Sequence, residues 1–241
     1  MKVMVYKTAE EIAEAVGRII IKRVADEPSC AIGFATGASP VPTYEYIVKE
    51  FDKGNISFKD MKTFNLDEYC DLPVEDKNSY HTFMHENLFD KIDVKAENIN
   101  FLDGNAEDYD AESARYAEAI KAAGGIKVQI LGIGTNGHIG FNEPADAFTD
   151  EAFKVTLTQS TIDSNQKYFG EQAMPRYAMT MGIGSIMRSE EIVLIATGEA
   201  KAKAIAAAVN GEVTPQCPAS ILQTHENVTF FVDEAAASLL K

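Results

Sequence analysis

The amino-acid sequence predicts an α/β fold in which helices cover both faces of a mostly parallel sheet. Strand-like and helix-like segments alternate along the whole chain, as in successive βα units. Several strand-like segments are continuous apolar runs, which is typical of strands buried on both faces. No Pro-, Gly- or Ser-rich linker, repeat or low-complexity tract interrupts the 241 residues, so we predict one domain spanning residues 1–241.

Local signals place the individual elements. A short strand opens the chain and a helix follows at residues 8–26, where Thr8 and Glu11 match a capping box. A helix at residues 110–123 ends at Gly124-Gly125. The remaining strands are expected at residues 30–35, 63–66, 128–133, 154–158, 177–181, 192–196 and 228–232. The remaining helices are expected at residues 42–51, 79–89, 161–168, 199–209 and 234–240.

Composition excludes several classes of partner. The net charge of −15 argues against nucleic acid and anionic membrane surfaces, although a small anion can still bind to backbone N–H groups. The chain contains no apolar run of transmembrane length and no signal-peptide pattern at its start. Cys30, Cys70 and Cys217 are too far apart to suggest a disulfide framework or a zinc knuckle. We therefore expect a cytoplasmic protein.

The most informative stretch is residues 131–144, Leu-Gly-Ile-Gly-Thr-Asn-Gly-His-Ile-Gly-Phe-Asn-Glu-Pro. It follows an apolar strand, and ligands of open α/β sheets bind at the carboxyl ends of strands. Its glycines permit close approach of the backbone to a ligand. His138 suits proton transfer near neutral pH, and Glu143 could orient it or balance its charge. The alternative is an ordinary glycine-rich turn with a chance histidine.

Three further loops follow predicted strands. Residues 33–40 place small and hydroxyl residues before a helix, an arrangement that can cradle a phosphate monoester or form a plain capped turn. Asp67 and Glu68 follow the strand at 63–66, and only one of them is expected to face a cleft; the alternative is a solvated acidic turn. Lys201 lies in the first turn of a predicted helix, where a cation opposes the helix dipole unless an anion is near; otherwise it is a solvated lysine.

The other histidines are weaker candidates. His81 and His85 lie four residues apart on a predicted helix, but no third ligand accompanies them, so we expect them to pack or to face solvent. His225 is expected to form structural hydrogen bonds. No metal site is predicted.

Taken together, these loops resemble the glucosamine-6-phosphate deaminase family, also called glucosamine-6-phosphate isomerases. The resemblance covers nearly the whole chain, and the Gly-His-Ile-Gly-Phe-Asn-Glu-Pro run is its most specific part. Related 6-phosphogluconolactonases share a Gly-His loop but continue with Ser-Leu-Phe-Pro. The matching stretches are residues 35–40, 63–69, 79–84 and 134–144.

The resemblance implies a modified Rossmann-like three-layer sandwich and a role for each loop. Asp67 would move a proton between C2 and C1 of the sugar, His138 would open the pyranose ring, and Glu143 would tune His138. The phosphate would be held by Thr36, Gly37, Ala38 and Ser39, with Lys201 as its cation. The implied reaction converts glucosamine 6-phosphate and water to fructose 6-phosphate and ammonia without a cofactor.

Three departures from the family pattern stand out. Asn136 occupies a position where the family often has aspartate, and it cannot supply a charge to His138. Lys167 stands where the family commonly offers an arginine to the phosphate, and lysine is a point charge rather than a bidentate fork. Residues 150–155 contain a single cation, so allosteric activation by an N-acetylated sugar phosphate is not expected.

Several alternatives stay open. The chain could be a galactosamine-6-phosphate deaminase, a 6-phosphogluconolactonase or a non-catalytic sugar-phosphate sensor. The lack of a basic helix-turn-helix segment counts against a complete regulator. The expected partner is a small-molecule sugar phosphate, with no nucleic acid and no membrane. The sequence leaves open the configuration at C4 of the sugar and whether the chain forms a homo-oligomer.

Overall fold

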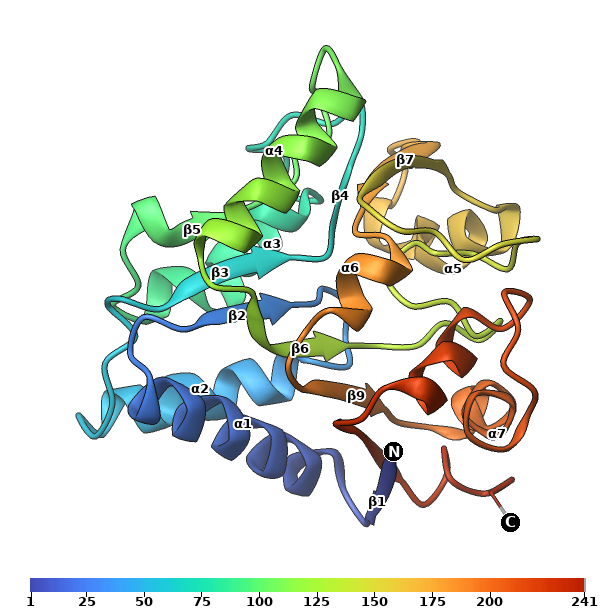
Figure 1. Ribbon diagram of the computed structural model, residues 1–241, viewed down its shortest axis with the longest axis horizontal. Coiled ribbons are helices and arrows are strands. Elements are labelled where there is room, and N and C mark those ends of the chain that lie inside the picture. The colour runs from blue at the N-terminus through green and yellow to red at the C-terminus, as the bar shows by residue number, and fades with distance from the viewer. Residues whose placement is uncertain (241) are drawn as a thin grey trace.

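A seven-stranded sheet, parallel throughout, forms the centre of the computed structural model, which describes residues 1–240 (Figure 1). The strand order is β1-β10-β9-β6-β2-β3-β5. The strands are β1 (Lys2–Tyr6), β10 (Val228–Asp233), β9 (Ile192–Ala196), β6 (Ile126–Leu131), β2 (Ala31–Phe34), β3 (Lys62–Asn65) and β5 (Ile99–Asn100). The predicted α/β class and its parallel sheet are confirmed.

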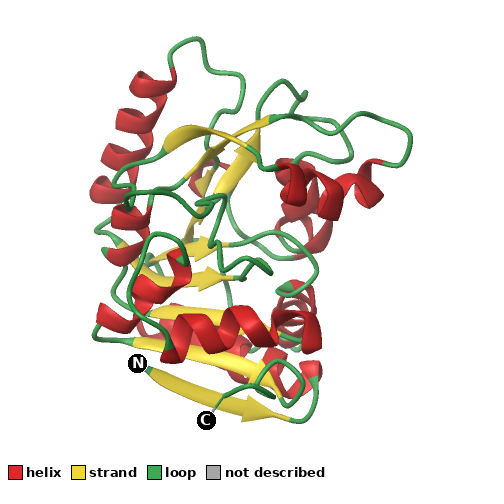
Figure 2. Cartoon of the chain, turned by 90° about the vertical axis from the view of Figure 1, so that its right-hand side faces the viewer, coloured by secondary structure: helices red, strands yellow, loops and turns green. Residues whose placement is uncertain are grey.

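Helices cover both faces of this sheet (Figure 2). Tyr44 of α2 (Val41–Asp52) packs against Phe34, whereas Tyr116 of α4 (Tyr109–Ala122) packs against Phe64. Phe34 and Phe64 point to opposite faces because Phe34 pairs with Asn65, the neighbour of Phe64. The α-helices are α1 (Ala9–Asp26), α2 (Val41–Asp52), α3 (Tyr80–Asn87), α4 (Tyr109–Ala122), α5 (Gln159–Phe169), α6 (Ile183–Met187) and α7 (Ala202–Asn210). Short 3₁₀ segments are η1 (Phe89–Lys91), η2 (Ala96–Asn98), η3 (Glu199–Lys201) and η4 (Pro218–Thr224). Within residues 1–240, no helix combines the length and the apolar character needed to cross a bilayer.

A second, antiparallel sheet of three strands was not expected from the sequence. Its strands are β4 (Asp67–Tyr69), β8 (Tyr177–Thr180) and β7 (Phe153–Thr156), in that order. The strands expected at residues 154–158 and 177–181 therefore exist but do not extend the parallel sheet. Asp67-Glu68-Tyr69 is a strand rather than an acidic turn. Its partner strand lies more than 100 residues away in sequence, so no local pattern could reveal the pairing.

The sequence predicted the start of α1 correctly but predicted a closing helix that does not form. The capping box that starts α1 is present: Thr8 accepts from the Glu11 N–H at 3.2 Å, and Glu11 accepts from the Thr8 N–H at 3.3 Å. The closing helix expected at residues 234–240 is wrong, because residues 234–239 form turns instead. The Asp233 carboxylate accepts from the N–H groups of both Ala236 and Gly198, which ties this short segment to a neighbouring loop. A single turn so held does not propagate as a helix.

The buried apolar side chains form two clusters. The large one fills the space between the parallel sheet and its helices. The smaller one joins the antiparallel sheet to α5, and its members are Tyr69, Leu72, Phe141, Leu157, Phe169, Met174 and Ala178. Phe141 belongs to the Gly-rich stretch of residues 131–144. This second cluster therefore packs the small sheet and α5 against that stretch.

Candidate active site

The polar loops singled out in the sequence meet at one edge of the parallel sheet. β9, β6, β2 and β3 are adjacent and parallel, and each ends beside its neighbour. The segments that follow their carboxyl ends carry Lys201 after β9, the histidine loop (residues 132–144) after β6, Thr36–Ser39 after β2 and Asp67 after β3. Loops at this edge are the usual place for a ligand in such sheets.

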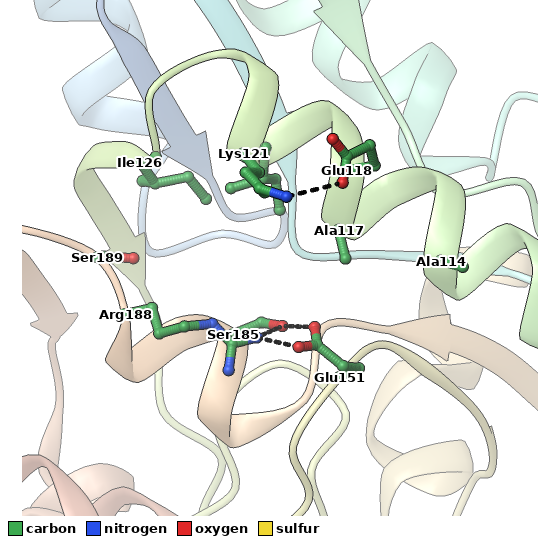
Figure 3. A pocket seen from close by; sticks show the side chains of 11 residues that line it. Ala114, Ala117, Glu118, Lys121, Ile126, Glu151, Ser185, Arg188 and Ser189 are labelled. Carbon is green, nitrogen blue, oxygen red and sulfur yellow. Dashed lines mark hydrogen bonds and ion pairs between the residues drawn. The ribbon is translucent and has the colours of Figure 1, made fainter.

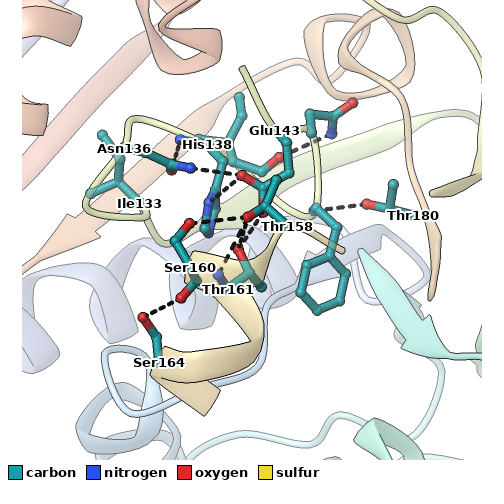
Figure 4. A network of polar contacts seen from close by, with 12 residues as sticks. Ile133, Asn136, His138, Glu143, Thr158, Ser160, Thr161, Ser164 and Thr180 are labelled. Atoms are coloured by element: carbon teal, nitrogen blue, oxygen red, sulfur yellow. Dashed lines mark hydrogen bonds and ion pairs between the residues drawn. The ribbon is translucent and has the colours of Figure 1, made fainter. Parts of the chain in front are cut away.

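His138 and Glu143 form the polar centre of the histidine loop (Figure 4). His138 Nδ1 lies 3.4 Å from Glu143 Oε2. Asn136 donates from Nδ2 to the same Glu143 oxygen at 2.7 Å, and its own Oδ1 accepts from the His138 backbone N–H at 3.2 Å. Asn136 thus connects the carboxylate to the backbone that carries the imidazole. An ordinary glycine-rich turn would not build this network.

The second oxygen of Glu143 is held by the start of α5. Thr158 donates from its hydroxyl to Glu143 Oε1 at 3.2 Å, and Thr161 donates to the same atom. Burial by itself raises the pKa of Glu143, but His138, Thr161 and Asn136 more than offset it and lower the pKa to about 2. Glu143 is therefore an ionised carboxylate at any pH at which the protein would work.

Two glycines are needed for this loop to pack as it does. A Cβ on Gly134 would lie 2.3 Å from His138 Cε1, so the imidazole rests directly on the backbone there. Gly140 has φ +57°, a conformation that favours glycine, and its Cβ would lie 3.0 Å from Thr180 Oγ1 and 3.6 Å from Asp67 Oδ2. The close approach at Gly140 brings the histidine loop against the strand that bears Asp67.

Asp67 is a buried carboxylate with 6% of its surface exposed. No group in residues 1–240 donates a hydrogen bond to its side chain, and burial together with neighbouring Glu68 raises its pKa to about 8. Glu68 points away and accepts the N–H groups of Tyr69, Tyr80 and His81. The expectation that the two carboxylates diverge is borne out, and the alternative of a solvated turn is wrong.

Thr180 ties the two catalytic candidates together. It is the direct register partner of Asp67 in the small sheet, and its hydroxyl accepts from the Phe141 N–H at 3.0 Å. Phe141 follows Gly140 in the histidine loop. Asp67 and His138, 71 positions apart in the sequence, are thereby held on neighbouring elements.

Residues 36–39 lie between β2 and α2 with the features of an anion cradle. No side chain caps the N-terminus of α2 among the residues described, unlike the capped ends of α1 and α3. Gly37 has φ +97°, and the space where its Cβ would lie is open. A turn capped by Ser39 or Thr36 is thus not what forms here. Backbone N–H groups at a helix start suit a phosphate.

Lys201 is a half-buried cation that faces the site rather than a solvated lysine. Its Nζ donates to the backbone carbonyl of Ile133, in the histidine loop, at 2.6 Å. No carboxylate of residues 1–240 forms an ion pair with it. Burial lowers its pKa, and Lys167 on α5 lowers it further. The two lysines therefore act on the same region, and an anion there would relieve both effects.

The remaining histidines stand as structural residues. His81 and His85 stack with ring centroids 4.4 Å apart on α3, and His85 contacts Asp90. His225 lies 2.9 Å from the Ser189 carbonyl through Nε2 and accepts from the Asn227 N–H through Nδ1. Across residues 1–240, no group of three His, Cys, Asp or Glu side chains is placed to hold a metal.

A cavity of about 330 Å³ between α4 and α6 lies elsewhere (Figure 3). Ile126 lines it and is the first residue of β6, so the cavity is at the opposite end of that strand from the histidine loop. Its charged residues are already paired, Arg188 with Glu151 at 2.6 Å and Lys121 with Glu118 at 3.4 Å. We do not assign it to the active site.

Comparison with known proteins decides the family. The sequence profile described as glucosamine-6-phosphate isomerases/6-phosphogluconolactonase matches residues 5–231. The chain belongs to this family. A relative from Clostridium botulinum (strain Alaska E43 / Type E3) is 46% identical over all 241 residues and 97% of its own length, and one from Thermoanaerobacter sp. (strain X514) is 43% identical over 95% of its own length. Both relatives are named glucosamine-6-phosphate deaminase.

Solved structures of the family agree with this fold. A structure described as a monomeric glucosamine-6-phosphate deaminase superposes with a TM-score of 0.95 at 39% identity, covering 99% of this chain and 100% of the other. The 6-phosphogluconolactonase of Trypanosoma brucei superposes with a TM-score of 0.75 at 19% identity, covering 100% and 98%. The second likeness shows the shared fold alone.

Three polar residues of this site were not singled out by sequence: Thr158, Thr161 and Thr180, which act through their hydroxyls. Glu68 was singled out, but its anchoring of α3 was not expected. Thr158 and Thr161 had a usable signal, because Thr158 is the N-cap of α5 and accepts from the Thr161 N–H at 3.3 Å. Thr180 had none, since its partners are distant in sequence.

Proposed function

We propose that this protein converts glucosamine 6-phosphate and water to fructose 6-phosphate and ammonia. The observation that carries the proposal is that two different proton-transfer groups lie on segments that meet at Gly140. Asp67, buried and with no hydrogen-bond donor among residues 1–240, lies against Gly140; His138, two residues before Gly140, lies beside an ionised Glu143. An aldose–ketose isomerisation needs one group that removes a proton from C2 and returns it to C1, and a second group that opens the sugar ring.

Each residue has a definite step in this proposal. His138 transfers a proton at the ring oxygen and opens the pyranose, while Glu143 stabilises the charged imidazole. The Asp67 carboxylate then takes the proton from C2 and returns it to C1. The resulting imine at C2 is hydrolysed by water, which releases ammonia and leaves the ketone. The backbone of residues 36–39 and the cations Lys201 and Lys167 hold the phosphate, remote from C1 and C2.

The raised pKa of Asp67 has a direct kinetic consequence. A base must be ionised to act, so the active fraction rises as the pH rises through about 8. The same elevation makes Asp67 a stronger base than an ordinary aspartate once ionised. This favours removal of a weakly acidic proton from carbon.

Location and assembly complete the proposal. Cys30, Cys70 and Cys217 are free thiols, which fits a reducing cytoplasm, where a phosphorylated amino sugar would be met. A homo-oligomer is left open by the sequence, while the structural relative above is described as monomeric. Light scattering of the purified protein would measure its mass directly.

The deciding experiment is ammonia release from a panel of substrates. Glucosamine 6-phosphate should be turned over with fructose 6-phosphate as product, and unphosphorylated glucosamine should be a poor substrate. Preference for galactosamine 6-phosphate, or hydrolysis of 6-phosphogluconolactone instead, would establish one of the alternative enzymes. Tight binding of the sugar phosphate without turnover would make the protein a sensor and refute the proposal.

A further inference from the structure

Glu68 is a buried carboxylate beside the proposed base that the reaction itself does not use. It is 4% exposed and accepts three backbone N–H groups, from Tyr69 at 2.8 Å, Tyr80 at 2.9 Å and His81 at 2.8 Å. Its Oε1 receives two of these donors and Oε2 the third. Both oxygens act as acceptors, which is the pattern of an ionised carboxylate. Glu68 thereby fastens the first turn of α3 to β4.

The turn that Glu68 fastens carries an aromatic contact to the histidine loop. Tyr80 is the first residue of α3, and its ring stacks on Phe141 with centroids 6.0 Å apart and planes at 9°. The Tyr80 hydroxyl donates to the Tyr69 hydroxyl at 3.1 Å. Phe141 immediately follows Gly140, the point at which the histidine loop meets Asp67. A continuous chain of contacts therefore runs from β4 through α3 back to the loop of His138.

We propose that Glu68 is a positioning residue: it fixes α3 and the Tyr80 ring so that Asp67 and the histidine loop keep one relative position during catalysis. This inference rests on the proposed function and adds a residue to the same site. Displacement of catalytic groups by about 1 Å can cost about 100-fold in rate, so a support of this kind affects turnover more than binding.

The charge of Glu68 also acts on Asp67. The titratable side chains around Asp67 are Tyr44 of α2, Glu68 and Tyr69 of β4, Tyr80 of α3 and Tyr116 of α4. Burial raises the pKa of each of these tyrosines, so they stay neutral across the working range. Burial raises the pKa of Glu68 and its three backbone N–H donors oppose that rise, and Glu68 is the one of these neighbours whose negative charge acts on Asp67. Removing that charge must lower the pH at which Asp67 ionises.

Two substitutions separate the two effects. Glu68→Gln removes the charge and turns an amide N–H toward the His81 N–H, so one of the three contacts is lost. Glu68→Asp keeps the charge but is one methylene too short to reach α3. The matched control is Glu112→Gln, which alters another buried carboxylate, on α4, that accepts from the Asp103 N–H at 2.7 Å. All three proteins are assayed for ammonia release from glucosamine 6-phosphate over a range of pH, with thermal melts as a check of folding.

We expect Glu68→Gln to lower kcat about tenfold or more while KM changes less than about threefold, and to move the acid limb of the pH profile downward. Glu68→Asp should lower kcat similarly without moving the acid limb, and Glu112→Gln should leave both kcat and the acid limb unchanged.

If Glu68→Gln keeps the wild-type kcat and the wild-type acid limb, the inference is overturned, as it is if KM alone changes. If Glu68→Gln does not fold, Glu68→Asp decides. If neither folds, Glu68 serves folding only and the inference is wrong. A wild-type protein that releases no ammonia would instead reject the proposed function, and this inference with it.

Discussion

Replacing Asp67 by asparagine should abolish turnover and stabilise the fold at the same time. Asparagine keeps the shape of the side chain but cannot accept a proton from carbon. General acid–base catalysis typically contributes about 10²- to 10⁴-fold, so kcat should fall by at least that factor. A stabilising substitution that destroys activity would mark Asp67 as a group held at a cost to stability for the sake of function.

The size of the stabilisation follows from the pKa. The folded protein raises the pKa of Asp67 from 3.8 to about 8, so the folded state holds this proton more tightly than the unfolded chain does. Its contribution to stability is complete below pH 3.8 and is lost as the pH rises through about 8. At about 1.4 kcal/mol per pKa unit, the loss at pH 9 is at most about 6 kcal/mol, and at pH 5 at most about 2 kcal/mol. Asparagine does not ionise and escapes this loss.

Urea unfolding of both proteins at pH 5 and pH 9 measures the effect. The free energy of unfolding of Asp67→Asn should exceed that of the wild type by more at pH 9 than at pH 5, with equal m-values. Asp146→Asn, which alters an exposed aspartate, is the control and should show no such difference. An advantage that is absent at pH 9, or the same at both pH values, would mean that Asp67 is not a buried group with a raised pKa.

Three further substitutions test the other roles. Lys201→Ala should raise KM for the sugar phosphate about 10- to 100-fold with a smaller fall in kcat, because the phosphate contact is shared by ground and transition states; an unchanged KM in steady-state kinetics would exclude a phosphate role. Asn136→Asp places a second carboxylate at the 2.7 Å contact with Glu143, so NMR should show His138 titrating at higher pH than in the wild type; identical titrations would mean that residue 136 only shapes the loop. Glu143→Gln should lower kcat by at least about tenfold, a part of the ~10²–10⁴ available to acid–base catalysis, because the charge that stabilises the protonated imidazole is lost. The acid limb near pH 8 should not move, since the pKa of Glu143 is about 2 and Glu143 does not titrate near pH 8; a shifted acid limb would implicate Glu143 in that titration.

The local sequence was sufficient wherever the cause of a structure is itself local. The capping box of α1 needs only Thr8 and Glu11. The strand β9 is buried on both faces because all of its side chains are apolar. The rule that ligands bind at carboxyl ends of parallel strands then placed the loops of Asp67 and His138 at one edge, since it requires only the strand directions.

Contacts between distant segments were beyond any local pattern. β4 becomes a strand because β8 supplies its hydrogen bonds, and the closing segment fails to become a helix because Asp233 is shared with Gly198. The burial that raises the pKa of Asp67 is likewise assembled from several elements at once.

The sequence by itself determined the class of fold, the parallel sheet and the identity of the polar residues at its edge, because periodicity, caps and glycine-rich loops act over a few residues. Only the tertiary structure decided that Glu68 turns toward α3, and that Thr180 joins Asp67 to the histidine loop. The physical reason is that hydrogen bonds and desolvation depend on which groups meet in space, and those groups come from strands and helices far apart in the chain.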